Sequence, residues 1–331
     1  MNPKDTTKIN SGITEITLSA PSGIRMTLTN YGATLMRLQV PNSQGILTDV
    51  VIGLPRAEDY ATPAYQKLNF CMGATIGRYA GRIFKGGFTL NTTFYPLGQE
   101  ITLHGGKNGF DKQLWKVEEI QEGESPFALF SLDSKEGADG FPGNVKVFAK
   151  YQLVDRSLQI SYTATTDAPT VLNLTNHSYF NLNGEGSVAG NRLYVNSQHI
   201  LQTDERLIPT GRLLDVASTP YDYTQPTALE FEGHYGLDTP FVLGEGTLKA
   251  SLYAPHAGIQ MEVTTNQPAM VLFTPQDFPK MGLRNQTNFG HFPAICFECQ
   301  NYPDAPNQSH FPSANLLPGE EYRNEISYLF N

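Results

Sequence analysis

The chain has 331 residues, a formal net charge of −9 at pH 7 and a pI near 5.3. This acidic balance argues against nucleic acid or an anionic membrane as the main partner, because both attract basic surfaces. Hydrophobic residues make up 40% of the chain, as in soluble globular proteins. The start of the chain does not resemble a secretory leader, and no apolar run approaches the roughly 20 residues that a membrane-spanning helix needs. We therefore expect a cytoplasmic protein.

Short strands are predicted from the start of the chain. Residues 13–19 and 24–29 alternate between apolar and polar side chains around a Pro-Ser-Gly turn, which predicts a hairpin. Similar runs follow at 33–41 and 46–54. Residues 55–61 begin with a proline in a first-turn position and are one of the few predicted helical turns.

Residues 73–88 are rich in glycine and place Arg78 and Arg82 four positions apart. Glycine allows close backbone approach, so an arginine here can bind ligand hydroxyls or a carboxylate. A tight β corner with two solvated or salt-bridged arginines is an equally common arrangement. A strand is predicted at 94–103, and His104 follows it with two glycines behind, in a position suited to face a cleft.

Antiparallel strands are predicted at 114–120 and 126–132, followed by strands at 145–153 and 158–164. The next strand-like run, 171–182, interleaves polar and apolar residues densely. Buried polar groups without partners cost roughly 1–3 kcal/mol each, so the polar ones must bond to one another or to a ligand. They are Asn173, Asn176, His177, Ser178, Tyr179 and Asn181.

The region 184–237 is rich in Gly, Thr, Pro and Asp and is predicted to form long connections at the rim of a sandwich. Asp238 follows it, just before an X-Pro turn in which aspartate is common for turn chemistry alone. Further strands are predicted in the closing part of the chain, at 248–254, 259–264, 270–274 and 326–330.

Glu298 lies in the middle of an apolar strand-like run. Period-two spacing places Ile295, Phe297 and Cys299 on one face of this strand and Glu298 with Gln300 on the other. A carboxylate there loses solvation, which raises its pKa toward neutrality and suits it to proton transfer. A strand-edge glutamate that points at water is the alternative.

Cysteine usage does not predict a disulfide framework, because the chain has only three cysteines, Cys71, Cys296 and Cys299. The last two form a C-x-x-C pair, but residues three apart on a strand point to opposite faces. A zinc site would also need further ligands, and no H-x-H or H-E-x-x-H occurs. Dinucleotide and P-loop motifs and G-x-S-x-G are absent as well, which leaves a metal-free acid/base site as the expected chemistry.

Nowhere does a helical period persist for four turns. Strands spaced about eight to twelve residues apart are typical of a sandwich or barrel. We therefore predict an all-β antiparallel sandwich with few short helices, formed by residues 1–331 as a single domain, with most loops gathered at a cleft. A carbohydrate-binding module usually needs an aromatic platform. The lone tryptophan, Trp115, lies in a strand-like run and does not supply one, although Tyr302 or Phe289 could supply a stacking ring.

Several of these segments together resemble the aldose 1-epimerase (galactose mutarotase) family. The resemblance implies a large antiparallel β-sandwich that interconverts the α and β anomers of free hexoses such as glucose and galactose, without a cofactor or metal. The matching segments occur in the family's order and span most of the chain. They are GRYAGRI (77–83), LHGG (103–106), TNHSYFNL (175–182), GLDTPF (236–241), FECQNYPDAPN (297–307) and LLPGEEY (316–322).

The resemblance also implies roles for individual residues. Glu298 matches the general base and His177 the general acid. His104 matches a second histidine at the sugar, Arg82 an arginine that binds hydroxyls, and Asp238 a carboxylate that holds ring hydroxyls. Two positions depart from the family: Gly81 stands where many members have Asn, and Val271 where some have Gln.

Three alternatives remain open at this point. A glycoside hydrolase would use Glu298 and Asp238 as a carboxylate pair roughly 5–9.5 Å apart. A sugar-binding sandwich would bind without turnover. The same fold could also act on a phosphorylated sugar or a disaccharide; only Lys107 and Lys112 offer cationic groups near LHGG. The preferred sugar and the choice between monomer and homodimer stay open.

Overall fold

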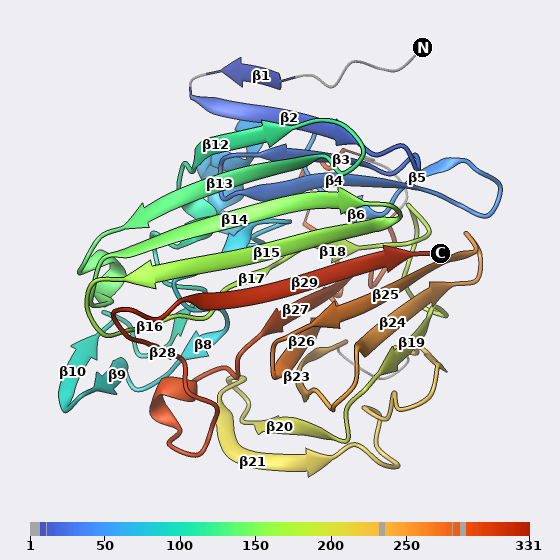
Figure 1. Cartoon of the computed structure of the whole chain (residues 1–331). Helices are drawn as coiled ribbons and strands as arrows, with labels where there is room; N and C mark the ends of the chain where they lie inside the picture. Colours follow the sequence, from blue (N-terminus) through green and yellow to red (C-terminus); the bar gives the residue numbers. More distant parts are fainter. Residues whose placement is uncertain (1–6, 11, 232–235, 280, 285–288) are drawn as a thin grey trace.

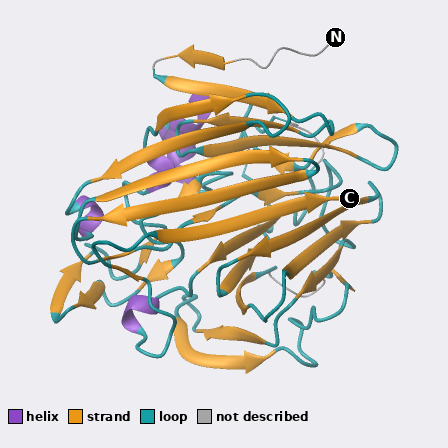
Figure 2. Ribbon diagram, in the orientation of Figure 1, coloured by secondary structure: helices purple, strands orange, loops and turns teal. Residues whose placement is uncertain are grey.

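The computed structural model describes residues 7–10, 12–231, 236–279, 281–284 and 289–331. Two large antiparallel sheets, of nine and seven strands, dominate these residues, and only one α-helix is present among them (Figures 1 and 2). This confirms the predicted all-β antiparallel sandwich. No helix in the described part is long and apolar enough to cross a membrane.

The nine-stranded sheet contains the longest strands. In β14 the burial alternates residue by residue, because its apolar side chains occur at every second position and face the core. The order across the sheet is β12 (Lys116–Gln121), β13 (Phe127–Ser134), β14 (Val145–Val154), β15 (Ser157–Thr166), β29 (Tyr322–Phe330), β25 (Ile259–Thr265), β24 (Leu248–Ala254), β19 (Arg192–Val195) and β22 (Thr227–Ala228).

The seven-stranded sheet carries Glu298. Its strand β27 is buried at all six positions, which explains why the sequence there is a nearly continuous apolar run. The order is β21 (Pro209–Asp215), β20 (His199–Thr203), β23 (Asp238–Val242), β26 (Ala269–Phe273), β27 (Ile295–Gln300), β18 (Tyr179–Phe180) and β6 (Val51–Ile52).

The remaining elements are smaller. A five-stranded sheet has the order β1 (Thr7–Asn10), β2 (Ile13–Ser19), β3 (Arg25–Thr29), β4 (Thr34–Pro41) and β5 (Leu47–Asp49). Four strand pairs are β9 (Gly87–Leu90) with β10 (Thr93–Pro96), β8 (Arg82–Ile83) with β11 (Thr102–Leu103), β7 (Thr75–Ile76) with β17 (Thr175–Asn176), and β16 (Thr170–Val171) with β28 (Asn315–Leu316). The helical segments are η1 (Ala57–Ala61), α1 (Pro63–Leu68), η2 (Phe110–Lys112), η3 (Ala138–Gly140) and η4 (Ala305–Asn307).

Aromatic side chains join the two large sheets. Phe180 and Phe297, both from the seven-stranded sheet, have ring centroids 6.2 Å apart. Phe180 also packs on Tyr328 of the nine-stranded sheet, with centroids 4.9 Å apart. All three are buried in one large apolar cluster to which strands of both sheets contribute. Burial of apolar surface between the sheets therefore holds the sandwich together.

The structure corrects several boundaries. The predicted helical turn at 55–61 is a 3₁₀ turn that begins at Ala57, and the α-helix follows it at Pro63–Leu68. Thr62 caps this helix, since its side chain accepts a hydrogen bond from the backbone of Tyr65. The strand predicted at 94–103 is interrupted between β10 and β11.

The prediction of long connections at 184–237 was wrong where the chain forms β19, β20, β21 and β22. β21 pairs only with β20 at the border of its sheet, and most of its side chains are exposed, so no apolar alternation marks it in the sequence. Residues 232–235 of this prediction lie outside the described residues.

Candidate active site

The strand register of the seven-stranded sheet assembles one wall of a cavity. Asp238 of β23 lies opposite Phe273 of β26, and Val271 of β26 lies opposite Glu298 of β27. Residues directly opposite one another, and those two apart along a strand, share a sheet face. These four side chains, with Gln300, line a cavity of about 210 Å³.

Loops and short strands supply the other wall. Arg82 begins β8, His104 directly follows its partner β11, and His177 lies between β17 and β18. All three line the same cavity as Asp238 and Glu298. The structure thus brings together the five residues predicted for the site, although they span more than 200 positions of the chain.

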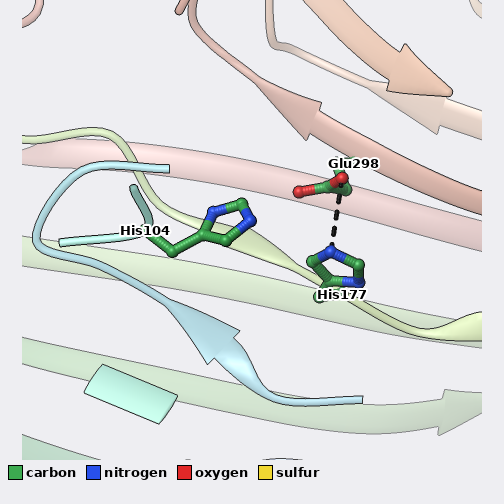
Figure 3. A group of neighbouring side chains, drawn as sticks. All are labelled: His104, His177 and Glu298. Atoms are coloured by element: carbon green, nitrogen blue, oxygen red, sulfur yellow. Dashed lines mark ion pairs between the residues drawn. The ribbon is translucent and has the colours of Figure 1, made fainter. Parts of the chain in front are cut away.

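Glu298 and His177 form a close titratable pair in this cavity. The Nε2 atom of His177 lies 3.6 Å from the Oε1 atom of Glu298, and the two side chains are only 6% and 4% exposed. Figure 3 shows the imidazole directed toward the carboxyl group. The buried Oε2 of Glu298 and Nδ1 of His177 have no hydrogen-bond partner among the described residues. Such atoms are costly in a folded core, so their presence is typical of a site that receives a ligand.

Burial shifts the pKa values of this pair in opposite directions. Desolvation, followed by the negative charge of Asp238, raises the pKa of Glu298 to about 8, while Arg82 acts to lower it. Desolvation lowers the pKa of His177 to about 4. Between these two values the pair holds one dissociable proton. It therefore contains both an acid and a base across neutral pH.

His104 is held in a defined orientation. Its φ of 52° places the residue in the left-handed region, and its backbone N–H donates to the Gly81 carbonyl at 3.0 Å. The Gly81 N–H donates in turn to Nδ1 of His104 at 3.3 Å, which leaves Nε2 to carry the proton of the neutral ring. Burial, and then the neighbouring His177, lower the pKa of His104 well below its usual value. His104 is therefore a neutral donor at physiological pH.

Arg82 and Asp238 form a polar pair in the cavity wall. Their side chains are 23% and 30% exposed, and Nη2 of the arginine lies 3.6 Å from Oδ2 of the aspartate. Burial raises the pKa of Asp238, and Arg82 offsets part of that rise. At this distance both groups keep hydrogen-bonding capacity for a ligand.

Other polar residues singled out in the sequence are structural. Arg78 is 2% exposed and donates to the carbonyls of Pro142 and Gly143, so only the second arginine of its segment reaches the cavity. The amide groups of Asn173, Asn176 and Asn181 likewise donate to backbone carbonyls. These bonds satisfy the buried amides and fix the loop that carries His177.

Sequence reasoning missed Gln300. This fully buried residue lines the cavity, and its Oε1 has no hydrogen-bond partner among the described residues. Its position two residues after Glu298, on the same strand face, was the available signal. Gly81 adjoins it: a Cβ atom built on Gly81 would lie 3.1 Å from Nε2 of Gln300. The side chain of Gln300 therefore lies next to the position where many family members carry an Asn side chain in place of Gly81.

Aromatic contacts also differ from expectation. Of the described residues, Phe70, Tyr179 and Phe273 line the cavity, whereas Tyr302 and Phe289 do not. Tyr179 stacks on the ring of His177 with centroids 5.0 Å apart, which fixes the imidazole plane.

The cavity also contains a set of side chains with metal-ligating atoms. His104, His177 and Glu298 each offer one such atom, and these atoms lie within 4.8 Å of one another. Two histidines and a carboxylate are a ligand set that Zn²⁺ accepts. The three cysteines take no part in this set; they are buried and form no disulfide.

Comparisons with known proteins agree over nearly the whole chain. The family model for aldose 1-epimerase matches residues 14–329. A galactose mutarotase from Sus scrofa is 36% identical over 323 residues, which cover 93% of this chain and 91% of the relative. An aldose 1-epimerase from Escherichia coli K12 is 33% identical over 334 residues, covering 95% and 94%.

Solved structures give the same result. A GalM/aldose epimerase homologue from C. elegans superposes with a TM-score of 0.88 at 28% identity, covering 98% of this chain and 99% of its own. Galactose 1-epimerase from Lactobacillus acidophilus superposes with a TM-score of 0.84 at 28% identity, covering 99% of both chains.

Proposed function

The chain belongs to the aldose 1-epimerase family, and we infer that its cavity interconverts the α and β anomers of free aldoses such as glucose and galactose. One observation carries the assignment of the site. A buried carboxyl and a buried imidazole meet at 3.6 Å in a cavity of about 210 Å³. That volume lies below the roughly 300–1,000 Å³ of pockets for drug-sized ligands and suits a single pyranose.

Mutarotation needs one base and one acid close together. The base removes the proton from the anomeric hydroxyl while the acid protonates the ring oxygen; the bond between C1 and the ring oxygen breaks, and an aldehyde forms. Both oxygens are bonded to C1, so two protein atoms 3.6 Å apart can serve both. Rotation about the C1–C2 bond and reclosure, with the two roles exchanged, give the other anomer.

We assign Glu298 as the base and His177 as the acid for ring opening. Before a sugar binds, the shared proton resides on Glu298, because its pKa of about 8 exceeds the value of about 4 for His177. The reactive form has this proton on the imidazole. The charge of Arg82 acts in that direction, since it lowers the pKa of Glu298. After ring opening the proton is back on the carboxyl group, and reclosure returns it.

Arg82, His104 and Asp238 hold the pyranose in this proposal. An arginine, a neutral imidazole donor and a carboxylate supply both donors and acceptors for ring hydroxyls. Hydrogen bonds to hydroxyls discriminate between sugars more strongly than apolar contacts do. The apolar wall formed by Val271 opposite Glu298 gives no such bond, so sugar preference depends on these three residues and Gln300.

The comparisons do not favour a hydrolase or a binding module. A cytoplasmic location also belongs to this proposal, supported by three buried thiols that form no disulfide. That residues 1–331 form a single domain likewise remains a prediction, as does the expectation of a monomer or a homodimer.

Polarimetry of freshly dissolved α-D-glucose and α-D-galactose tests the assignment. The unmodified protein should accelerate the change in optical rotation. Glu298→Gln keeps the shape but cannot accept a proton, and we expect the rate to fall at least roughly 100-fold. Sugar binding, measured by calorimetry, should persist. Full activity in this variant would overturn the assignment of the base.

A further inference from the structure

Arg82 needs support from outside its own strand. β8 comprises only Arg82 and Ile83, which pair with the two residues of β11, and so short a strand pair is marginally stable by itself. The guanidinium does not fix the residue either, because its 3.6 Å separation from Asp238 is longer than a hydrogen bond. The position of Arg82 therefore depends on the groups that hold its backbone.

Asp304 holds this backbone on both sides of the arginine side chain. The N–H of Asp304 donates to the carbonyl of Arg82 at 2.7 Å, and its Oδ1 accepts a hydrogen bond from the N–H of Phe84 at 2.9 Å. The φ of Asp304 is 56°, in the left-handed region where aspartate is enriched. One residue thus fixes the chain from Arg82 to Phe84.

Asn307, at the end of the η4 turn, fixes Asp304 in its place. Its Nδ2 donates to Oδ1 of Asp304 at 2.8 Å and to the carbonyls of Phe84 and Gly87 at 3.0 and 3.1 Å. Neither Asp304 nor Asn307 lines the cavity that contains Glu298. This part of the FECQNYPDAPN segment therefore binds the chain from Arg82 to Gly87 and does not reach the sugar.

The carboxyl group of Asp304 uses only one of its oxygens. Asp304 is 1% exposed, and its Oδ2 has no hydrogen-bond partner within the described ranges of the chain. Burial raises the pKa of Asp304, and the hydrogen bonds from Phe84 and Asn307 offset part of that rise. Both of these bonds go to Oδ1, so the amide oxygen of an asparagine could accept them equally well.

We propose that Asp304 is a positioning residue for Arg82, which it holds beside Asp238 so that both side chains bind ring hydroxyls of the sugar. Asp304 itself does not contact the substrate and acts through the arginine. The inference rests on the proposed function and deepens it, because it adds a residue outside the cavity on which sugar binding depends.

Asp304→Gly tests this role, because glycine adopts a φ of 56° without strain while the variant loses the carboxyl group. We expect kcat/KM for glucose, measured by polarimetry, to fall at least roughly tenfold, mainly through a higher KM. Asp304→Asn retains the accepting oxygen and should stay within about threefold of the unmodified protein. An equal loss in Asp304→Asn would overturn the proposal, since the hydrogen bonds to Oδ1 would then not account for the effect.

Asp167→Gly is the matched control. The carboxylate of Asp167 likewise accepts hydrogen bonds from a backbone N–H and a side-chain amide, both of Asn144, at 2.8 and 2.7 Å. Asp167 does not line the cavity that contains Glu298, so kcat/KM should change less than about twofold. A loss as large as that of Asp304→Gly would contradict a specific role for Asp304.

A double-mutant cycle with Arg82→Met separates positioning from folding. Without the guanidinium, Asp304→Gly should lower kcat/KM by less than about twofold, because its effect passes through Arg82. If urea unfolding shows that Asp304→Gly does not fold, Asn307→Ala replaces it in the cycle, since it removes the amide that holds Asp304. Equal losses with and without Arg82 would overturn the inference alone. Failure of the unmodified protein to accelerate mutarotation would overturn the proposed function and the inference with it.

Discussion

Opposite pKa shifts in two neighbouring side chains define the chemistry of Glu298 and His177. Between about pH 4 and about pH 8 the pair holds one proton; below this range it holds two and lacks a base, and above it holds none and lacks an acid. The two pKa values of such a pair determine the rising and falling limbs of a bell-shaped dependence of rate on pH.

We therefore expect kcat/KM for mutarotation to rise with pH through about 4 and fall through about 8. Initial polarimetric rates from pH 3.5 to 9.5, corrected for the spontaneous reaction in each buffer, measure the profile. A rate that keeps rising above pH 9 would show that protonation of this pair does not limit catalysis.

Gln300 adds a prediction about binding. Its buried Oε1 has no hydrogen-bond partner in the part of the chain that the structure describes, so a sugar hydroxyl that bonds to it contributes about 1 kcal/mol or more. Gln300→Leu should raise KM for glucose roughly 5- to 30-fold and change kcat less. Gln159→Leu, on an exposed position of β15, is the control. An unchanged KM in Gln300→Leu would show that this amide does not contact the sugar.

Close backbone packing between elements positions the two histidines. A Cβ atom on Gly105 would lie 2.1 Å from the Gly77 carbonyl oxygen, so the LHGG and GRYAGRI segments meet backbone to backbone. The φ of Gly105 is +81°, a conformation that favours glycine. His104 immediately precedes this contact, and its orientation depends on it.

Gly105→Ala should lower the free energy of unfolding by roughly 2–5 kcal/mol, the sum of backbone strain and overpacking. It should also reduce activity, because His104 must move. Gly98 has a nearly equal φ of +77° and no atom within 4 Å of an added Cβ, so Gly98→Ala isolates the strain alone. Denaturant unfolding of both variants measures the difference, and equal losses would exclude the packing contribution.

The sequence allowed prediction of strands that pair along their length within a sheet and bury one face. β14 and β15 are such strands, and alternation located them nearly to the residue. Strands at the border of a sheet, such as β21, were not predicted, because their side chains are mostly exposed and show no apolar alternation. The run at 171–182 divides into β16, β17 and β18, since the chain passes between three sheets there, and no periodicity encodes such a passage.

The five predicted site residues depended on motif resemblance, and the structure places all of them in one cavity. Gln300 was not predicted, because an unpaired buried oxygen is a property of the assembled fold. A second cavity, of about 840 Å³ beside β20, β21 and β23, was not predicted for the same reason, because it forms only where these three strands lie side by side.

At the scale of the whole molecule, Glu298 links the site to global stability. Its pKa is about 8 in the folded protein and near the ordinary 4.5 in the unfolded chain. The folded state therefore binds this proton more tightly, and the contribution to stability is complete below pH 4.5 and lost as the pH rises through about 8.

The free energy of unfolding of Glu298→Gln, taken relative to that of the unmodified protein, should consequently increase by roughly 2–5 kcal/mol when the pH is raised from 5 to 9. His177 also makes stability depend on pH, in the opposite direction, but it is present in both proteins, so its contribution cancels when the two are compared. Urea unfolding at the two pH values measures the change. A constant difference between the proteins would show that the folded carboxyl titrates as it does in water.

Glu298, the proposed base, resides on β27, a central strand of its sheet with all six residues buried, whereas the hairpin of β20 and β21 borders a second cavity of about 840 Å³ at the margin of the sheet. On the proposed function, the proton-transferring groups and this marginal cavity therefore lie on separable parts of the architecture. Directed evolution that diversifies only this hairpin should therefore leave the proton-transfer residues in place.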